Sequence, residues 1–568
     1  MDFRKFLKNN IILLDGGTGS LLIKNGLKAN EYPERLNVSN SDIITKIHKD
    51  YYDAGSNVVC TNTFGANSLK FSNLELEKII KCAIENVKNA QKLSKGKQKK
   101  FVALDIGPTG KMLKPFGDLD FEDAVEIFKT TVKIAVKYGV DLVLIETMND
   151  IYETKAAVLA VKECSTLPIL VSNVYSKDGV TLSGTTPESA IATLEGLGVD
   201  AIGINCSLGP KDLIPVIEKY LKNSSIPVLF KPNAGLPRVD GDVTVYDVDK
   251  EIFATDVSSM LDKGVRIVGG CCGTTPEYIL QLNKIIKGKK PKNIVEKNHT
   301  VVSSFSKAVY FDKPIIIGER INPTGKKRLK QAILDDDIGY VLEEAINQQK
   351  AGAHVLDVNV GIPEKDEKVT LVKFIKEIQS AIDLPLQIDT VSFNALEKSL
   401  RIYNGKPLIN SVNGKKESME TVFPLAKKYG GAIVCLCLDE SGIPETVDGR
   451  ITIAKKIINK AKEYGIKEKD LIFDALTMTI SNNAENGKIT LETIERISKM
   501  GYKTILGVSN ISFGLPNRDF INSTFLISAL NKGLSSAIMN PLSQEMMKAF
   551  YSYSACFGFD KNFEKYIS

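Results

Sequence analysis

The sequence is poor in histidine and contains no long apolar run. Its 568 residues include three histidines, His48, His299 and His354, so any catalysis has to depend on carboxylates, thiolates or a metal more than on imidazole acid–base chemistry. No stretch approaches the roughly 20 apolar residues of a membrane helix, and the first residues lack the apolar core and cleavage site of a signal peptide. We therefore expect a cytoplasmic protein with no membrane partner.

Charge of one sign is not concentrated in any segment. The chain has 74 lysines and arginines against 68 aspartates and glutamates, a formal net charge of +6 that is spread along its length. Without a basic cluster, a nucleic-acid partner is not indicated. Nine cysteines without a secretion signal are typical of reduced thiols, not of a disulfide framework. Their spacing therefore matters as a possible source of metal ligands.

Short apolar runs alternate with longer amphipathic segments, the pattern of βα units around a parallel sheet. Eight strands are expected in the first half, at residues 11–15, 58–62, 102–108, 142–147, 169–175, 201–207, 228–235 and 267–273. Eight more are expected in the second half, at 315–322, 355–361, 385–391, 407–414, 432–439, 471–478, 503–510 and 534–541. A chain of this length accommodates two barrels of about 250 residues each. We predict an α/β protein with two consecutive (β/α)8 TIM barrels.

The boundary between the two barrels is expected in a segment rich in lysine and serine. Residues 287–307 show no apolar periodicity. We therefore predict a first barrel at 1–288, a short linker at 289–309, and a second barrel at 310–568 that ends in a closing helix.

Three cysteines lie at the predicted ends of two strands. Cys206 ends the sixth strand, and the adjacent Cys271 and Cys272 end the eighth. Active sites of such barrels lie at the C-terminal ends of the strands, and ends two strands apart are roughly 10 Å from each other, close enough for side chains to share a zinc ion. Asn233, on the strand between, is a possible fourth ligand, weak enough to be replaced by a substrate.

The alternative is that these thiols are buried small hydrophobic groups. We assign the remaining six cysteines to that class: Cys60, Cys82, Cys164, Cys435, Cys437 and Cys556.

Seven motifs of the first half resemble the homocysteine-binding barrel of homocysteine S-methyltransferases. They are LLDGGTGS (13–20), TNTFGAN (61–67), DIGPTG (105–110), IETMND (145–150), GINCSLGP (203–210), KPNAG (231–235) and GGCCGTTP (269–276). The resemblance spans about residues 1–288. It implies a catalytic zinc ion on Cys206, Cys271 and Cys272, with the homocysteine sulfur at the open position. It also implies that the amino-acid end of homocysteine is held by Asp15, Gly16, Gly17 and Glu146.

Six motifs of the second half resemble the pterin-binding barrels of folate methyltransferases and dihydropteroate synthases. They are GERINPTGKK (318–327), LDVNVG (356–361), IDTVSF (388–393), INSVNG (409–414), IFDALT (472–477) and GVSNISFGLPNR (507–518). The resemblance implies that Asp389, Asn410 and Asp474 grip the pterin ring. The cavity around it would be lined by Glu319, Asn322, Asp357, Asn359, Asn510 and Arg518, with Asn510 near the methyl-bearing nitrogen. For any single residue, a helix cap or a satisfied buried amide is the alternative.

A homocysteine barrel followed by a folate barrel resembles the first two modules of the cobalamin-dependent methionine synthase family. That family binds its corrinoid through an Asp-x-His-x-x-Gly motif, and here the residues two positions before the histidines are Lys46, Lys297 and Gly352. We therefore expect methyl transfer from 5-methyltetrahydrofolate to homocysteine, giving methionine and tetrahydrofolate, through cobalamin carried by a partner protein or by another domain. Two alternatives stay open: a homocysteine methyltransferase with a different methyl donor, and a module that binds zinc or folate without catalysis.

Overall fold

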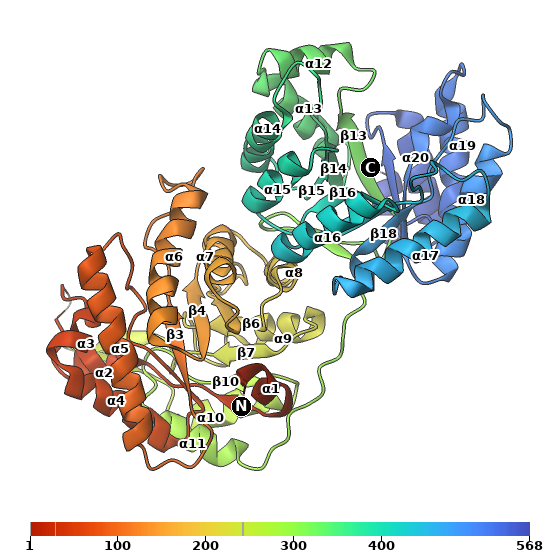
Figure 1. Cartoon of the computed structure of the whole chain (residues 1–568). Helices are drawn as coiled ribbons and strands as arrows, with labels where there is room; N and C mark the ends of the chain where they lie inside the picture. The colour runs from red at the N-terminus through yellow and green to blue at the C-terminus, as the bar shows by residue number, and fades with distance from the viewer. Residues whose placement is uncertain (1, 29, 241–242, 568) are drawn as a thin grey trace. The chain divides into compact units, whose positions relative to one another are not determined.

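The chain forms two compact units, which are described separately. The computed structural model describes residues 2–28, 30–240 and 243–567 (Figure 1). The first unit comprises residues 1–195 and 199–297, and the second comprises residues 196–198 and 298–568. Each unit contains eight parallel strands, which confirms the predicted pair of consecutive (β/α)8 barrels.

The first barrel pairs its strands in the order β1-β10-β7-β6-β5-β4-β3-β2. The bounds are β1 (Ile12–Leu13), β2 (Val58–Cys60), β3 (Phe101–Ile106), β4 (Leu142–Met148), β5 (Ile169–Asn173), β6 (Ala201–Asn205), β7 (Val228–Lys231) and β10 (Ile267–Val268). The two end strands, β1 and β2, are linked by a hydrogen bond from Asn57 N to Leu13 O (2.7 Å). The sheet therefore curves into a nearly closed barrel.

Helices surround these strands, and an amphipathic helix packs its apolar stripe against them. In α6 (Phe121–Tyr138), Val125, Phe128 and Val132 are at most 2% exposed, the spacing that buries one helix face. The other helices of this unit are α1 (Phe3–Asn9), α2 (Thr18–Lys24), α3 (Leu36–Ser39), α4 (Ser41–Ala54), α5 (Asn73–Leu93), α7 (Ile151–Cys164), α8 (Pro187–Leu197), α9 (Ile214–Asn223), α10 (Lys250–Leu261) and α11 (Pro276–Ile286), with the 3₁₀ turn η1 (Pro33–Arg35).

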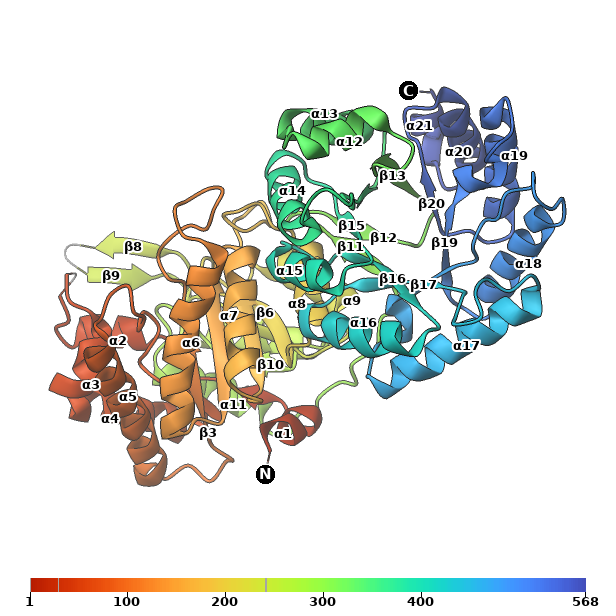
Figure 2. The ribbon, with the colours of Figure 1, turned by 45° about the horizontal axis from the view of Figure 1, so that its top comes forward.

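Two antiparallel hairpins do not follow from the βα pattern. The hairpin of β8 (Pro237–Asp240) and β9 (Val243–Tyr246) follows β7 (Figure 2). The hairpin of β11 (Val301–Ser303) and β12 (Ala308–Tyr310) overlaps the segment expected to be a linker, and it joins the second unit through Ser303 N and Lys406 O (2.8 Å). Strands of three or four residues carry too little alternation to be recognised in a polar segment.

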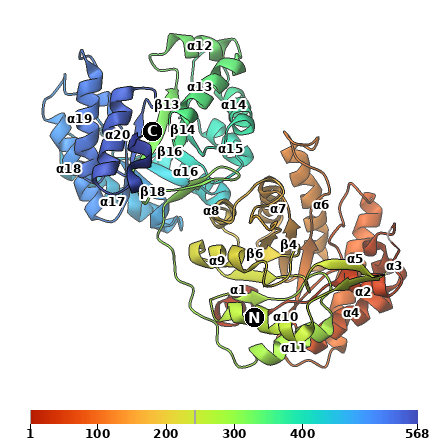
Figure 3. The same ribbon diagram turned by 180° about the vertical axis from the view of Figure 1, so that it is seen from behind.

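The second barrel is fully closed, because β13 pairs with both β14 and β20. Its strands are β13 (Ile315–Ile321), β14 (Val355–Val358), β15 (Leu386–Asp389), β16 (Leu408–Asn413), β17 (Ala432–Leu436), β18 (Leu471–Asp474), β19 (Lys503–Gly507) and β20 (Ser536–Met539). Figure 3 shows helices outside these strands. They are α12 (Lys327–Leu334), α13 (Ile338–Lys350), α14 (Glu367–Ala381), α15 (Phe393–Ile402), α16 (Lys416–Tyr429), α17 (Val447–Glu463), α18 (Asn486–Lys499), α19 (Arg518–Asn531), α20 (Gln544–Cys556) and α21 (Glu564–Ile567), with the 3₁₀ turns η2 (Glu468–Asp470), η3 (Val508–Ser512) and η4 (Lys561–Phe563).

The core of each barrel is apolar and the strand ends are polar. Leu144, Leu170 and Leu229 are fully buried inside the first barrel, and Ile317, Leu408 and Ile472 inside the second. Each such side chain contributes about 1.5–3 kcal/mol on burial, which fixes the strands and leaves the residues after them to form sites. Among the described residues, no helix combines the length and the apolar composition needed to cross a bilayer.

Candidate active sites

The first barrel brings its three strand-end cysteines together. Cys206 follows β6, and Cys271 and Cys272 follow β10. Their Sγ atoms all lie within 4.8 Å of one another, and the Sγ atoms of Cys206 and Cys272 are 3.8 Å apart. Ligands placed tetrahedrally at 2.3 Å from a zinc ion are about 3.8 Å from each other. The spacing and the soft sulfur donors therefore fit a zinc ion.

The backbone around the cysteines is held in a conformation that side-chain-bearing residues rarely adopt. Cys206 and Ser207 both have a φ of 59°, in the left-handed region. Hydrogen bonds fix this turn, since Cys206 N donates to Lys231 O (3.1 Å) and Leu208 N donates to Cys206 O (2.8 Å). Such strain costs about 1–3 kcal/mol per residue and persists where surrounding contacts over-determine it, often at functional sites.

Asn233, the expected fourth ligand, contacts the cysteine loop through its side-chain oxygen. Asn233 Oδ1 accepts a hydrogen bond from Cys272 N (3.1 Å), and the residue is buried. This contact positions the Cys272 backbone. A role for Asn233 as a metal ligand stays a prediction.

Burial and the net effect of the neighbouring thiols raise the pKa values of Cys206 and Cys272. The hydrogen bond with Cys206 lowers the pKa of Cys272, but the bond with Cys271 and burial outweigh it and raise that pKa to about 12. The pKa of Cys206 is raised to about 11, because the bond with Cys271 lowers it less than the bond with Cys272 and burial raise it. Negative charges gathered in a recessed site need a cation as partner.

The cysteines form one wall of a cavity of about 370 Å³. The cavity is lined by residues of β2, β3, β4 and β7, by residues that follow β1, β2, β6 and β10, and by η1. Its lining residues are Asp15, Gly16, Gly17, Thr18, Gly19, Ser20, Pro33, Glu34, Cys60, Thr61, Asn62, Phe64, Asp105, Glu146, Thr147, Cys206, Lys231, Cys271 and Cys272. The four residues expected to hold the amino-acid end of homocysteine and the three cysteines are therefore in the same cavity.

A buried lysine that the sequence analysis did not identify lies among the carboxylates of this cavity. Lys231, at the end of β7, is 3% exposed, and its Nζ lies 2.8 Å from Glu146 Oε2 and 3.5 Å from Asp15 Oδ1. Burial would lower the pKa of Lys231, but the charges of Glu146 and Asp15 outweigh burial and raise it well above the ordinary value. The ammonium group therefore stays charged. The signal that could have revealed it is a lysine directly after the apolar run of residues 228–230.

Gly16 and Gly17 allow the first loop to pack against the cysteine loop. A Cβ on Gly16 would lie 2.7 Å from Thr274 O, and one on Gly17 would lie 2.6 Å from Cys271 O. Neither distance is possible for a real side chain, so only glycine fits. Gly17 N donates to Thr274 O (2.9 Å), which ties α2 to the loop after β10.

In the second barrel, two predicted asparagines meet a predicted aspartate. Asp389 Oδ2, at the end of β15, accepts hydrogen bonds from Asn359 Nδ2 (3.0 Å) and Asn322 Nδ2 (3.4 Å). Burial raises the pKa of Asp389 to about 6, although the Asn359 bond opposes the shift. The three side chains, from three consecutive strands or the loops after them, therefore form one polar cluster.

The other predicted acceptors lie at neighbouring strand ends. Asp357, at the end of β14, is 3% exposed and accepts from Gln387 Nε2 (2.7 Å). Burial and then the charge of Asp389 raise the pKa of Asp357 well above its ordinary value. Asp474 Oδ1, at the end of β18, accepts from Leu476 N (2.7 Å), and burial raises its pKa to about 6. Asn410 lies in β16, where its carbonyl accepts from Thr390 N (3.2 Å).

Asn510 lies in the 3₁₀ turn η3, which two predicted residues support. Glu319 Oε2 accepts from Ser509 Oγ (3.0 Å). Arg518 Nη2 donates to Ser509 O (2.7 Å), and its Nε donates to Ser512 Oγ (3.0 Å). Glu319 and Arg518 therefore fix the turn that carries Asn510.

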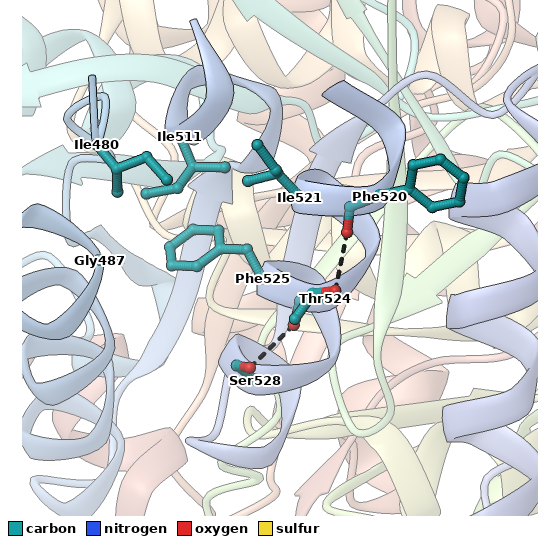
Figure 4. Close-up of a pocket in the computed structure, with 8 residues that line it drawn as sticks. All are labelled: Ile480, Gly487, Ile511, Phe520, Ile521, Thr524, Phe525 and Ser528. Atoms are coloured by element: carbon teal, nitrogen blue, oxygen red, sulfur yellow. Dashed lines mark hydrogen bonds between the residues drawn. The ribbon is translucent and has the colours of Figure 1, made fainter. Parts of the chain in front are cut away.

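An apolar pocket of about 460 Å³ lies beside η3 (Figure 4). It is lined by Ile480, Gly487, Ile511, Phe520, Ile521, Thr524, Phe525 and Ser528. The hydroxyls of Thr524 and Ser528 donate to backbone carbonyls within α19. None of the predicted folate residues lines this pocket, so we interpret it as loose packing between α18, α19 and η3.

Replacing Gly487 with alanine should stabilise the second barrel. Gly487 is the second residue of α18, and an added Cβ would lie 3.8 Å from Ile480 Cγ2 and 3.9 Å from Ile511 Cδ1, ordinary contact distances. Removing a glycine from a helix and covering apolar surface is worth about 0.5–1 kcal/mol. Urea unfolding of the second barrel should shift to a higher midpoint. Gly514→Ala is the control, because φ is +82° there and the midpoint should fall; a lower midpoint for both variants contradicts the prediction.

Two family models match the chain, one in each barrel. Residues 12–286 match the family described as Homocysteine S-methyltransferase. Residues 318–540 match the family described as Pterin binding enzyme. Each match covers nearly all strands of its barrel.

The chain also resembles curated proteins over both barrels. It is 30% identical to methionine synthase of Mycobacterium leprae over 580 residues, which cover 95% of this chain and 48% of that protein. It is 30% identical to methionine synthase of Mycobacterium tuberculosis over 575 residues, with the same coverages. The chain therefore spans about half the length of these relatives.

Two solved structures each resemble about half of the chain. The metallated form of the homocysteine methyltransferase MmuM from Escherichia coli is 22% identical, with a TM-score of 0.43, and covers 50% of this chain and 98% of its own. Dihydropteroate synthase from Xanthomonas albilineans is 16% identical, with a TM-score of 0.37, and covers 45% of this chain and 98% of its own. The first barrel is therefore similar to homocysteine S-methyltransferases and the second to pterin binding enzymes, and over both barrels the chain is similar to part of two methionine synthases.

Proposed function

We propose that this chain transfers the methyl group of 5-methyltetrahydrofolate to homocysteine through a corrinoid carried elsewhere, giving methionine and tetrahydrofolate. The observation that carries the proposal is the cluster of Cys206, Cys271 and Cys272 at the spacing of tetrahedral zinc ligands, on the wall of a charged cavity. The family assignments of both barrels and the relatives named methionine synthase support the two substrates.

The three cysteines would hold the zinc ion and leave one position for the substrate sulfur. When bound, zinc favours the thiolate form of homocysteine, which is the nucleophilic form of a thiol. The protein supplies the strained Cys206 turn and the Asn233 contact to Cys272, which keep the sulfur atoms in place. Charged groups line the same cavity as the cysteines, and the amino-acid end of the substrate would bind among them.

The second barrel would bind the folate through acceptors at its strand ends. A pterin ring presents N–H donors, and a buried carboxylate can accept two such hydrogen bonds. We assign this role to Asp389 and Asp474, which lie at the ends of β15 and β18. The departing nitrogen is a poor leaving group until it is protonated, so the site needs a proton source. Asp357, whose pKa burial and the charge of Asp389 raise well above the ordinary value, is our candidate.

A corrinoid partner completes the proposal. No aspartate lies two residues before any of the three histidines, so this sequence contains no Asp-x-His-x-x-Gly motif for cobalamin. We place the cobalamin on a separate protein or on another domain.

Two half-reactions test the proposed function. The zinc-loaded chain, incubated with homocysteine and methylcobalamin, should produce methionine. With 5-methyltetrahydrofolate and cob(I)alamin, it should produce tetrahydrofolate and methylcobalamin. Methionine without the folate half-reaction would favour a different methyl donor. Binding of homocysteine and folate without either product would favour a storage module and overturn the proposal.

Folate affinity should fall in mild acid. Burial raises the pKa values of Asp389 and Asp474 to about 6. Above this pH both side chains are carboxylates that can accept hydrogen bonds from the pterin ring. Below it each side chain is protonated, and its proton is directed toward the N–H donors of the ring. The dissociation constant of 5-methyltetrahydrofolate should be constant from pH 7 to 8 and should rise as the pH falls through 6. Each of the two aspartates should contribute a rise of up to about tenfold for each pH unit. The Asp474→Asn curve corrects for titration of the folate itself; parallel curves for this variant and the wild type would contradict a role for Asp474.

A further inference from the structure

The cavity of the first barrel holds more carboxylates than its one lysine can pair with. Asp15, Asp105 and Glu146 line the same space as Lys231. Lys231 contacts Glu146 Oε2 at 2.8 Å and Asp15 Oδ1 at 3.5 Å. Asp15 is further satisfied by Cys60 N, which donates to its Oδ2 (2.7 Å). Glu34 also lines the cavity, and its Oε1 accepts from Gly65 N (2.6 Å). Two of the four carboxylates, Asp15 and Glu146, are therefore already matched with a cation.

Among the described residues, Asp105 is the carboxylate of this lining that combines the lack of an ion pair with a buried oxygen that accepts no hydrogen bond. It lies near the end of β3 and is 7% exposed. Its Oδ1 is buried and has no hydrogen-bond partner among the residues that the structure describes. Its backbone is fixed, because Asp105 N donates to Thr61 Oγ1 (3.1 Å) and its carbonyl accepts from Thr63 Oγ1 (2.8 Å).

An unpaired buried carboxylate is costly, and a cationic ligand removes the cost. Burial and the charge of Glu146 raise the pKa of Asp105 well above its ordinary value and outweigh the opposing effect of Lys231, which agrees with a carboxyl group that no cation contacts directly. The substrate of the proposed function brings one cation, the ammonium of the amino acid.

We propose that Asp105 receives the ammonium group of homocysteine, and that Lys231 is the resident counter-ion of Glu146 and Asp15. The proposal rests on the proposed function and deepens it. It differs from the expectation that Asp15 and Glu146 hold the ammonium, because in this chain a protein ammonium already lies between them. The site would thereby select amino-acid thiols over thiols that lack an ammonium.

The test compares two thiols that differ only in that group. 4-Mercaptobutanoate is homocysteine with hydrogen in place of the ammonium. Binding of each thiol to the zinc-loaded chain is measured by calorimetry, and the ratio of the two dissociation constants is the readout. The wild type should prefer L-homocysteine, and Asp105→Asn should reduce that preference by about 30-fold or more, because a buried charge pair loses one partner.

Glu146→Gln is the matched comparison on the same cavity. It removes a partner of Lys231, so both thiols should be affected alike and the preference should be retained. Loss of the preference in Glu146→Gln, or its retention in a folded Asp105→Asn, would overturn the proposal. The Glu146→Gln result decides the question even if Asp105→Asn does not fold, which circular dichroism and zinc content check.

The two proposals fail differently. If the wild type binds neither thiol, the proposed function is wrong and this inference falls with it. If the wild type binds both thiols equally well and still makes methionine, the proposed function stands and the role of Asp105 is wrong.

Discussion

Replacing Cys272 with serine should remove the zinc ion from the first barrel. A serine hydroxyl does not ionise at neutral pH and is a harder donor than a thiolate, so the site would keep two sulfur ligands of three. Zinc held by protein thiolates is bound with about 10–16 kcal/mol of apparent free energy. Losing one of three sulfurs should therefore lower zinc affinity by several orders of magnitude.

The measurement is zinc content after dialysis against a chelator, with homocysteine binding measured on the same samples. The wild type should retain about one zinc ion per chain, as a three-thiolate site predicts, and Cys272→Ser should retain almost none. Homocysteine affinity should fall in parallel. Equal zinc content in the wild type and Cys272→Ser would contradict the proposed zinc site.

Cys164→Ser is the control for this substitution. Cys164 lies at the end of α7 in the same barrel and is partly exposed, as Cys272 is. It is not part of the cysteine cluster. Its zinc content and homocysteine affinity should match the wild type, which would separate loss of a ligand from a general effect of removing a thiol.

The strand-end cysteines could be found from the sequence because a barrel has a simple geometry. An apolar run followed by glycine and a polar residue indicates a parallel strand that ends at the active-site face. Once eight strands are counted, β6 and β10 must end near each other, with β7 alone between them in the sheet. Cys206 and the pair of Cys271 and Cys272 then meet without knowledge of any helix.

The pairing of Lys231 with Glu146 could not be found in this way. Glu146 lies on β4 and Lys231 on β7, with β5 and β6 between them in the sheet. Their 2.8 Å contact spans the inside of the barrel and depends on strand tilt and on how far each side chain reaches. A single lysine after an apolar run contains none of that information.

The hydrogen-bond partners of Arg518 and Gln387 in the second barrel could not be predicted from the sequence, for a similar reason. Arg518 was expected to line the folate cavity, and its guanidinium contacts Ser509 and Ser512. Gln387 was not singled out, yet it donates to Asp357 inside the barrel. Residue type and strand position predict that a side chain is near the site. They do not predict which neighbour receives its hydrogen bonds.

Replacing Asp474 with asparagine should weaken folate binding more than any other conservative change in the second barrel. Asp474 Oδ1 accepts from Leu476 N, and an asparagine can keep this bond through its own Oδ1. The local turn therefore survives. The second oxygen becomes an amide nitrogen, so a donor replaces the acceptor that the pterin ring would use. Such a mismatch in a recessed site costs about 2–4 kcal/mol, or about 30- to 1000-fold in affinity.

The chain offers a control with the same local geometry. Asp439, in the loop after β17, accepts from Ser441 N (2.9 Å), again two residues further along the chain, and it is not among the predicted folate residues. Asp439→Asn removes one carboxylate and keeps the same kind of turn, so 5-methyltetrahydrofolate affinity should stay within about twofold of the wild type, as expected for a surface change. Equal losses in the two variants would mean that the net charge of the barrel mouth, and not an acceptor at Asp474, governs folate binding.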